Sequence, residues 1–176
     1  FTGSGEKDIL KARVKLRKYP NSTVEIFASC AEIGQGCLTT LRKIVAETLG
    51  IPMEQVLHKY PDTSTCPDSG PTVASRTVMI VGRLLQDCAS EMKQRWEESS
   101  FDVSRAYKQQ EGLSWDSVKL QGNAYPEYSW GANVVEVEVD PITLEIEVSG
   151  IWSAYDIGMP IDERIVAGQV EGGMVQ

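Results

Sequence analysis

The sequence predicts a two-layer α/β sandwich of the α+β class with a mixed sheet. The apolar pattern switches between period two and helical spacing in the order hairpin, helix, strand, loop, long helix, second hairpin and C-terminal helix, without an internal repeat. The chain of 176 residues is long enough for a sizeable core, because a domain of about 150 residues buries roughly 70% of its unfolded surface. We therefore expect residues 1–176 to form a single domain.

The first expected element is a β-hairpin. Residues 10–18 and 24–30 alternate apolar and polar side chains on either side of the turn sequence YPNST. The second strand has four apolar residues on one face: Val24, Ile26, Ala28 and Cys30. Basic residues of the first strand alternate with Val14 and Leu16, so they indicate one solvated strand face and not a binding patch.

A helix is expected directly after this hairpin. Its apolar residues recur at helical spacing: Leu38, Leu41, Val45 and Leu49, with Ile44 beside them. Gly50 and Pro52 supply a stop signal. A short strand is expected at residues 56–60, and it carries His58, the only histidine of the chain. With no second histidine nearby, we interpret His58 as structural and not as a metal ligand.

The sequence PDTSTCPDSGPTVASR at residues 61–76 predicts a long loop. Long loops are uncommon in compact domains and usually serve a function. A long helix is expected to follow, ending near residue 98, with one apolar stripe: Ala74, Val78, Val81, Leu85, Cys88, Met92 and Trp96. Glycine in mid-helix costs about 1 kcal/mol relative to alanine, so we expect a neighbour to pack closely against Gly82.

The last third of the chain predicts a short helix, a hairpin and a final helix. The short helix is expected at residues 103–110, and the hairpin at residues 132–140 and 144–155, where valines alternate with acidic residues. We interpret the five carboxylates of this ribbon as a solvated face and not as acid–base catalysts. Asp162 is expected to cap a helix with the sequence ERIVAGQVEGGMVQ.

The composition excludes several classes of function. A net charge of -8 and a pI near 4.7 argue against a nucleic-acid partner, which needs clustered basic residues. The longest apolar runs fall short of the ~20 residues that a membrane span requires. The four cysteines form no C-x-x-C pair and no signal peptide precedes them, which argues against a zinc site or a secreted disulfide framework and favours the cytoplasm. Because the sequence starts without Met and stops in mid-pattern, we expect a fragment of a larger protein.

Three short stretches have residues that folding alone explains poorly, and the first is AEIGQGCLTT. Gly34 and Gly36 lie where a strand leads into a helix, and they allow backbone to approach a ligand closely. Gln35 between them offers hydrogen-bond donors and an acceptor without charge. A plain glycine-rich turn is the alternative interpretation, since one G-x-G alone is weak.

The second stretch is DSGPTVASRT, which leads the chain into the long helix. It brings the hydroxyls of Thr72, Ser75 and Thr77 and the cation of Arg76 to a helix N-terminus, where unpaired backbone donors favour phosphate or another anion. It lacks the G-x-x-x-x-G-K-[ST] pattern of a Walker P-loop. An ordinary Ser/Thr-rich cap with Arg76 on the surface is the alternative.

The third stretch is AGQVEGGMVQ in the final helix. Gln169, Gly172, Gly173 and Gln176 share a helical face, so the glycines open a shallow groove between two amide side chains. Each glycine of a helix, including Gly168, costs about 1 kcal/mol of propensity, so we expect something to approach that face closely. Packing of the helix on a strand is the alternative to a ligand site.

Together and in this order, the three stretches resemble the molybdenum-cofactor-binding part of the xanthine dehydrogenase and aldehyde oxidase family of hydroxylases. The resemblance lies in EIGQGCLTTLRKIVAETLGIP, in PDTSTCPDSGPTVASRTVMIVGRLL and in YDIGMPIDERIVAGQVEGGMVQ, and it spans almost the whole chain. It implies a molybdopterin-binding domain of the α+β fold named above, in truncated form. It also implies a cytoplasmic oxidoreductase that hydroxylates a small-molecule substrate, a heterocycle or an aldehyde, with oxygen from water.

The resemblance further implies a cofactor, partners and site residues. The cofactor is a molybdenum pyranopterin, or molybdopterin, with or without an attached nucleotide; 2Fe-2S clusters and FAD are expected on other domains or subunits. Ten residues would bind the cofactor: Gly34, Gln35, Gly36, Thr72, Val73, Ala74, Ser75, Arg76, Thr77 and Gln169. Glu171 would be structural.

Two parts of the family pattern are missing. The family's catalytic glutamate lies in a motif beyond Gln176, and its glycine-rich loop with the substrate residues lies in an earlier subdomain. We therefore expect no catalytic residue and no metal ligand in this chain, and no turnover by the fragment alone. A non-redox module that binds a phosphate-bearing ligand, or a scaffold subunit, are the rival interpretations.

Overall fold

The computed structural model describes residues 12–73, 75–108, 111–116, 118–123, 125 and 127–175. Its contacts divide the chain into two compact units, one comprising Phe1–Pro126 with Ile161–Gln176 and the other Glu127–Pro160. Among the described residues, no helix has both the length and the apolar character needed to cross a membrane.

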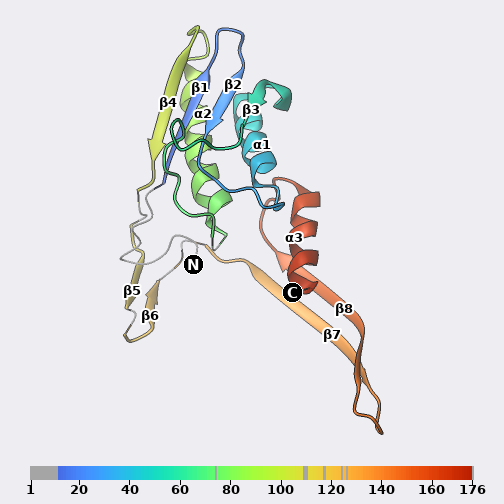
Figure 1. The fold of residues 1–176 in the computed structure, drawn as a ribbon. Coiled ribbons are helices and arrows are strands. Elements are labelled where there is room, and N and C mark those ends of the chain that lie inside the picture. The colour runs from blue at the N-terminus through green and yellow to red at the C-terminus, as the bar shows by residue number, and fades with distance from the viewer. Residues whose placement is uncertain are drawn as a thin grey trace. The chain divides into compact units, whose positions relative to one another are not determined.

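The first unit contains a four-stranded sheet in the order β3-β2-β1-β4 (Figure 1). Its strands are β1 (Arg13–Lys18), β2 (Val24–Phe27), β3 (Val56–Leu57) and β4 (Phe101–Ala106). β1 pairs antiparallel with both β2 and β4, whereas β2 and β3 pair in parallel. The expected hairpin and the mixed sheet are therefore both confirmed.

Two helical segments pack on one face of this sheet and make the second layer (Figure 1). They are α1 (Cys37–Leu49) and a π-helix η2 (Thr77–Gly82) that continues into α2 (Arg83–Gln94); a short 3-10 turn, η1 (Met53–Gln55), precedes β3. The apolar faces of both layers form one buried core, which includes Val14, Leu16, Val24, Ile26, Leu41, Val45, Val81, Leu85 and Met92. Because burying each such side chain contributes about 1.5–3 kcal/mol, this core accounts for the two-layer arrangement.

The opposite face of the sheet is polar, as the alternation in the first strand predicts. The guanidinium of Arg17 donates to both carboxylate oxygens of Asp102, at 2.7 and 2.8 Å. Lys15 lies 4.2 Å from the ring centre of Phe27. Lys18 is the exception, since it lies on the buried face, where its Nζ donates to the carbonyl oxygen of Glu98 at 2.7 Å.

Two expected elements are wrong in type or length. Residues 103–108 do not begin a helix, because Phe101–Ala106 is β4 and pairs with β1 along its whole length, with Val103 buried in the core; residues 109–110 lie outside the described residues. The strand expected at 56–60 contains only Val56–Leu57, so His58 follows the strand instead of lying on it.

The long helix also differs from its prediction. Its first turns, Thr77–Gly82, are a π-helix, and α2 ends at Gln94, four residues early, because the chain turns there to reach β4; Ala74 lies outside the described residues. The close approach expected at Gly82 is confirmed, since a Cβ on it would lie 2.9 Å from Cδ1 of Ile44 in α1.

The remaining elements include two small ribbons and the final helix. In the first unit, β5 (Ser114–Asp116) pairs with β6 (Gln121–Asn123), and α3 (Glu163–Val175) forms the end of the chain. Oδ1 of Asp162 accepts from the backbone N–H groups of Arg164 and Ile165 at 3.0 and 3.1 Å, which confirms the expected cap.

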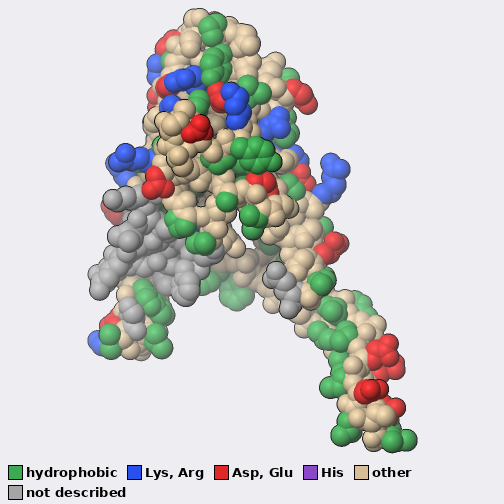
Figure 2. Space-filling model, in the orientation of Figure 1, with side chains coloured by type: hydrophobic (Ala, Val, Ile, Leu, Met, Phe, Trp, Pro, Cys, Tyr) green, Lys and Arg blue, Asp and Glu red, His purple; other side chains and the backbone are tan. Residues whose placement is uncertain are grey.

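The second unit is a hairpin of β7 (Trp130–Val139) and β8 (Ile146–Asp156). Its existence and its turn agree with the prediction. Both faces of the ribbon are exposed, and Figure 2 shows hydrophobic and acidic side chains together on its surface. In the sequence, the valines of β7 alternate with the acidic residues. In this structure the valines are exposed, like the acidic residues between them.

Candidate functional site

The first two of the three stretches lie side by side. Ser29 and Ser69 exchange hydrogen bonds, since each backbone N–H donates to the other residue's hydroxyl, at 2.9 and 2.8 Å. Two residues after Ser29 and three after Ser69, the backbone N–H of Ala31 donates to Oγ1 of Thr72 at 2.9 Å. Residues 29–31 therefore run along residues 69–72, and they bring the Gly-Gln-Gly turn to the loop that precedes η2.

Arg76 holds this loop from inside. Its side chain is 1% exposed, and Nη1 donates to the carbonyl oxygens of Ser69 and Pro71, both at 2.9 Å. A guanidinium can satisfy several carbonyls at once because its N–H groups form a rigid fork. The surface alternative for Arg76 is wrong, because the side chain is buried and supports residues 69–71; its role in binding the cofactor stays a prediction.

The Gly-Gln-Gly turn is closed by a carboxylate that sequence reasoning missed. Oε1 of Glu32 accepts from the backbone N–H groups of Gly34 and Gly36, both at 2.9 Å, and Oε2 accepts from Leu38 at 3.0 Å. Burial alone would raise the pKa of Glu32, but these three backbone bonds outweigh it and lower the pKa below its ordinary value. Its signal in the sequence is an acidic residue just before a helix, where the macrodipole favours negative charge.

The two glycines and Gln35 give this turn its shape. Gly34 and Gly36 have φ values of +99° and +80°, which side-chain-bearing residues adopt at a cost. The amide of Gln35 folds back, because its Oε1 accepts from the N–H of Ile33 and its Nε2 donates to the carbonyl of Ala31, both at 2.7 Å. An amide has a second N–H and a second lone pair, so Gln35 retains the capacity to bind a ligand.

Residues 72–77 divide into exposed and buried members. Val73 is 57% exposed, Ser75 is exposed, and Thr77, the first residue of η2, is buried. Ser75 has a φ of +58°, which is uncommon for a residue other than glycine, and a π-helix begins two residues later. Both features concentrate at functional sites, where the surrounding structure maintains the strain.

The start of α3 adjoins the first turns of α1. Asp162 forms an ion pair with Lys43, and a Cβ on Gly36 would lie 3.0 Å from Cδ1 of Ile165. Gln169 follows Ile165 by one helical turn and is exposed. Within the described part of the chain, no atom lies within 4 Å of a Cβ built on Gly168, Gly172 or Gly173, so the groove is open and the strand-packing alternative is not observed; Gln176 lies outside that part.

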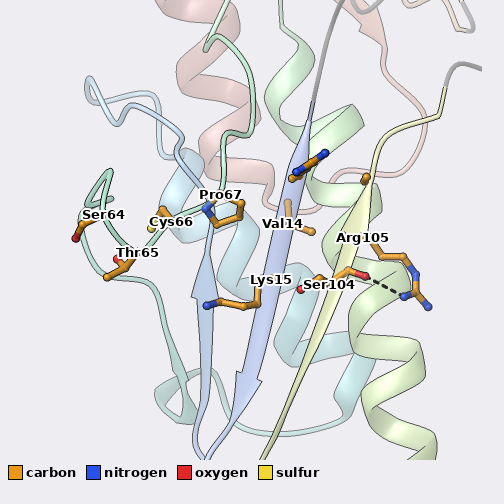
Figure 3. A pocket seen from close by; sticks show the side chains of 10 residues that line it. Val14, Lys15, Ser64, Thr65, Cys66, Pro67, Ser104 and Arg105 are labelled. Carbon is orange, nitrogen blue, oxygen red and sulfur yellow. Dashed lines mark hydrogen bonds between the residues drawn. The ribbon is translucent and has the colours of Figure 1, made fainter.

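A separate hollow of about 550 Å³ lies between residues 64–67 and strands β1 and β4 (Figure 3). Its lining includes the cations Arg13, Lys15 and Arg105 but none of the ten residues named above. Two of these cations have acidic neighbours, since Arg105 pairs with Glu91 and Nζ of Lys15 lies 4.0 Å from a carboxylate oxygen of Asp102. The hollow is therefore distinct from the site formed by the Gly-Gln-Gly turn, the loop before η2 and the start of α3, which we call the three-segment site.

The three-segment site offers neutral polar groups and open backbone. Its groups are glycine positions, the Gln35 and Gln169 amides and the Thr72 and Ser75 hydroxyls. They lie on three segments that meet around the N-terminus of α1, through the Ala31–Thr72 hydrogen bond and the close approach of Ile165 to Gly36. Among the residues that the structure describes, no three His, Cys, Asp or Glu side chains are grouped to hold a metal ion. This donor set suits a flat polar ligand that lies against backbone.

A family model described as a molybdopterin cofactor-binding domain matches residues 2–100 and 94–176. Xanthine dehydrogenase 1 of Arabidopsis thaliana is 28% identical over an alignment of 178 residues, which covers 90% of this chain and 13% of that protein. The nicotine 6-hydroxylase large subunit of Paenarthrobacter nicotinovorans is 27% identical over an alignment of 210 residues, which covers 98% of this chain and 26% of that subunit. The chain thus spans a small part of the length of these relatives.

Solved structures share the fold. The aldehyde oxidoreductase of Desulfovibrio gigas matches with a TM-score of 0.78 at 21% identity, covering 93% of this chain and 20% of that one. Reconstituted CO dehydrogenase from Oligotropha carboxidovorans matches with a TM-score of 0.79 at 18% identity, covering 98% of this chain and 26% of that one. The expected α+β architecture with a mixed sheet is thereby confirmed.

Proposed function

Since this chain belongs to the molybdopterin cofactor-binding domain family, we propose that it forms one wall of a molybdenum-pyranopterin site in a xanthine dehydrogenase- or aldehyde oxidase-like oxidoreductase. The observation that carries the proposal is the hydrogen bond from Ala31 to Thr72, which joins the Gly-Gln-Gly turn to the Ser/Thr-rich loop. The phosphate-binding module and the scaffold subunit receive no support from the family match or from the related structures.

Three groups of residues would hold the cofactor. Gly34 and Gly36 would let the flat pterin lie against backbone, and the remaining N–H and lone pair of Gln35 would meet its polar edge. In the second loop, the half-buried Thr72 and the exposed Val73 and Ser75 would receive the pterin phosphate or pyrophosphate near the start of η2. Gln169 would approach from α3, whose glycines leave space for it.

The buried residues would act by positioning. Arg76 would keep the carbonyls of Ser69 and Pro71 turned inward, so that the loop presents its outer side to the ligand. The carboxylate of Glu32 would hold the N–H groups of Gly34 and Gly36 and so fix the turn around Gln35. When bound, the molybdenum cofactor would supply the redox chemistry that hydroxylates a heterocycle or aldehyde with oxygen from water.

The other components of the enzyme would lie outside this chain. The remainder of the molybdenum subunit would complete the site, and 2Fe-2S and FAD domains or subunits would accept the electrons, in the cytoplasm. This chain alone would have no turnover, because it supplies one wall of the site without the family's catalytic glutamate. Substrate oxidation by the isolated 176-residue chain would contradict that expectation.

The test measures cofactor content in the polypeptide encoded by the whole gene. Gln35→Ala and Gln169→Ala should each lower molybdenum and pterin per chain, because each removes an amide from the proposed wall. Gln86→Ala is the matched control, since Gln86 is an exposed glutamine on α2 away from the three segments. Unchanged molybdenum and turnover in both site variants would refute the assignment.

A further inference from the structure

The hairpin of the second unit has two chemically different faces. Residues paired directly across an antiparallel ladder lie on the same face, and successive residues of a strand alternate between faces. Three pairs of aliphatic residues follow one another on one side: Val139 with Ile146, Val137 with Val148, and Val135 with Ile151. We call these six residues the aliphatic face.

A bulge keeps the aliphatic face continuous. The pairing passes from Val137–Val148 to Glu136–Gly150, so Ser149 is an extra residue in β8. This one-residue shift returns Ile151 to the same side as Val148, which strict alternation would place on opposite sides. The other side near the tip carries Glu136, with Glu138 directly opposite Glu147.

The aliphatic face lies open to solvent. Its side chains are between 45% exposed, at Ile151, and 68% exposed, at Ile146. Figure 2 shows this mixture of hydrophobic and acidic groups along the ribbon. A two-stranded hairpin is marginally stable at best in water, and the facing carboxylates of Glu138 and Glu147 weaken this one further. A contiguous apolar patch of this kind marks an interaction surface.

The matched relatives indicate what occupies that surface. This chain corresponds to 13% of xanthine dehydrogenase 1 of Arabidopsis and to 26% of the nicotine hydroxylase large subunit. Most of each relative therefore lies outside the region that the chain matches. An occupant of the aliphatic face must be apolar, because the nearest charges of the ribbon point to its other side.

We propose that the aliphatic face packs against an apolar strand or helix face of the remainder of the molybdenum-cofactor-binding polypeptide, and that Glu136, Glu138 and Glu147 on the other side stay in solvent. The proposal rests on the family membership and not on the cofactor residues. Loss of cofactor binding in a site variant therefore does not contradict the packing proposal. Failure of the packing proposal does not contradict the proposed cofactor site.

Hydrogen exchange tests this packing without any substitution. In the 176-residue chain, the backbone amides of β7 and β8 should exchange quickly, since a bare ribbon opens easily. In the polypeptide encoded by the whole gene, the same amides should exchange at least about tenfold more slowly, because packed elements open rarely. Equal exchange in both proteins would overturn the proposal.

A pair of lysine substitutions assigns the protection to one face. Val137→Lys puts a charge on the aliphatic face, and Glu138→Lys introduces the same residue on the next position, facing the other way. In the whole polypeptide, proteolysis within residues 130–156 should rise at least about tenfold in Val137→Lys and stay within about twofold in Glu138→Lys. Equal sensitivity of the two variants would count against the assigned face.

Self-association is the rival outcome. If the 176-residue chain is a dimer by light scattering, if its hairpin amides are already protected, and if Val137→Lys makes it monomeric, then a second copy covers the face and the proposal is wrong. A monomeric 176-residue chain with unprotected hairpin amides supports it.

Discussion

The backbone N–H of Ala31 donates to the hydroxyl of Thr72 at 2.9 Å, across 41 residues of sequence. This bond continues the reciprocal pair between Ser29 and Ser69, so two segments that end in candidate ligand loops are held in register. Side-chain hydroxyls thus supply these direct hydrogen bonds between the two segments, while Arg76 and the backbone of β1 anchor the second one.

Thr72→Val should separate the two loops while preserving side-chain shape. Loss of one partly exposed hydrogen bond should lower the free energy of unfolding by about 1 kcal/mol. Thr72→Ser keeps the hydroxyl and should stay close to wild type. Urea unfolding of the chain and molybdenum content of the longer polypeptide measure the two effects; if Thr72→Val matches Thr72→Ser in both, the bond has no role.

Arg76→Ala should be among the most destabilising changes in the loop. It leaves the inward carbonyls of Ser69 and Pro71 without their donor and opens a cavity, so we expect a loss of about 3 kcal/mol or more. Arg76→Lys should retain only part of the free energy of unfolding that Arg76→Ala loses, because an ammonium lacks the planar fork of a guanidinium. Arg83→Lys, on the exposed side of α2, is the control and should change unfolding by at most about 0.5 kcal/mol.

Glu32→Gln should lower the free energy of unfolding at pH 7 by about 1–2 kcal/mol, because an amide group replaces an acceptor beside three N–H donors. The pKa of Glu32 is lowered on folding, so the unfolded chain takes up the proton first. Its stabilisation is complete well above the ordinary glutamate pKa of about 4.3 and is lost as pH falls through the lower folded value. The difference between wild type and Glu32→Gln should therefore shrink below about pH 4.3, as chemical denaturation at several pH values would measure. The exposed Glu47→Gln is the control, and a difference that grows in acid would disprove the assignment.

Gly36→Ala should cost more than Gly34→Ala. Both positions have positive φ, which costs about 1–2 kcal/mol for an L-residue, but only the Cβ at position 36 meets Ile165. In an Ile165→Ala background the difference between the two glycine variants should disappear, as a double-mutant cycle would show. A difference that persists there would mean that α3 does not dock on this turn.

Cys66 should be the thiol that reacts first with a disulfide reagent at pH 8. Burial raises the pKa of Cys30 to about 11 and those of Cys37 and Cys88 to about 12, so their thiolate fractions are small. These three should react at least about tenfold more slowly than Cys66, which is partly exposed. Cys66→Ser should abolish the fast phase, and its survival would contradict the burial pattern.

Local sequence patterns sufficed for much of the fold. Period-two alternation located β1, β2 and the second hairpin, apolar spacing with Gly50 bounded α1, and Asp162 marked the start of α3. These elements depend on neighbours within a few residues, and such short-range patterns can be read directly.

Other features could not be predicted from local sequence patterns, because the residues that they contact are distant in sequence. The segment from Phe101 to Ala106 has no clear apolar period of its own, and it is a strand because it pairs with the edge of β1. The roles of Arg76 and Glu32 depend on which carbonyls and N–H groups the folded loops bring to them. The sequence showed that each loop carries suitable donors, but not which way those donors turn.

The sequence by itself determined β1, β2, α1, the second hairpin and the start of α3, together with the order of the three motif segments and the family resemblance, because periodicity, caps and motif letters are local. Only the tertiary structure decided that Thr72 meets Ala31, that Arg76 turns inward, and that the aliphatic face of the hairpin lies uncovered. The physical reason is that burial and hydrogen bonding between distant segments are settled by packing, and packing has no local signature.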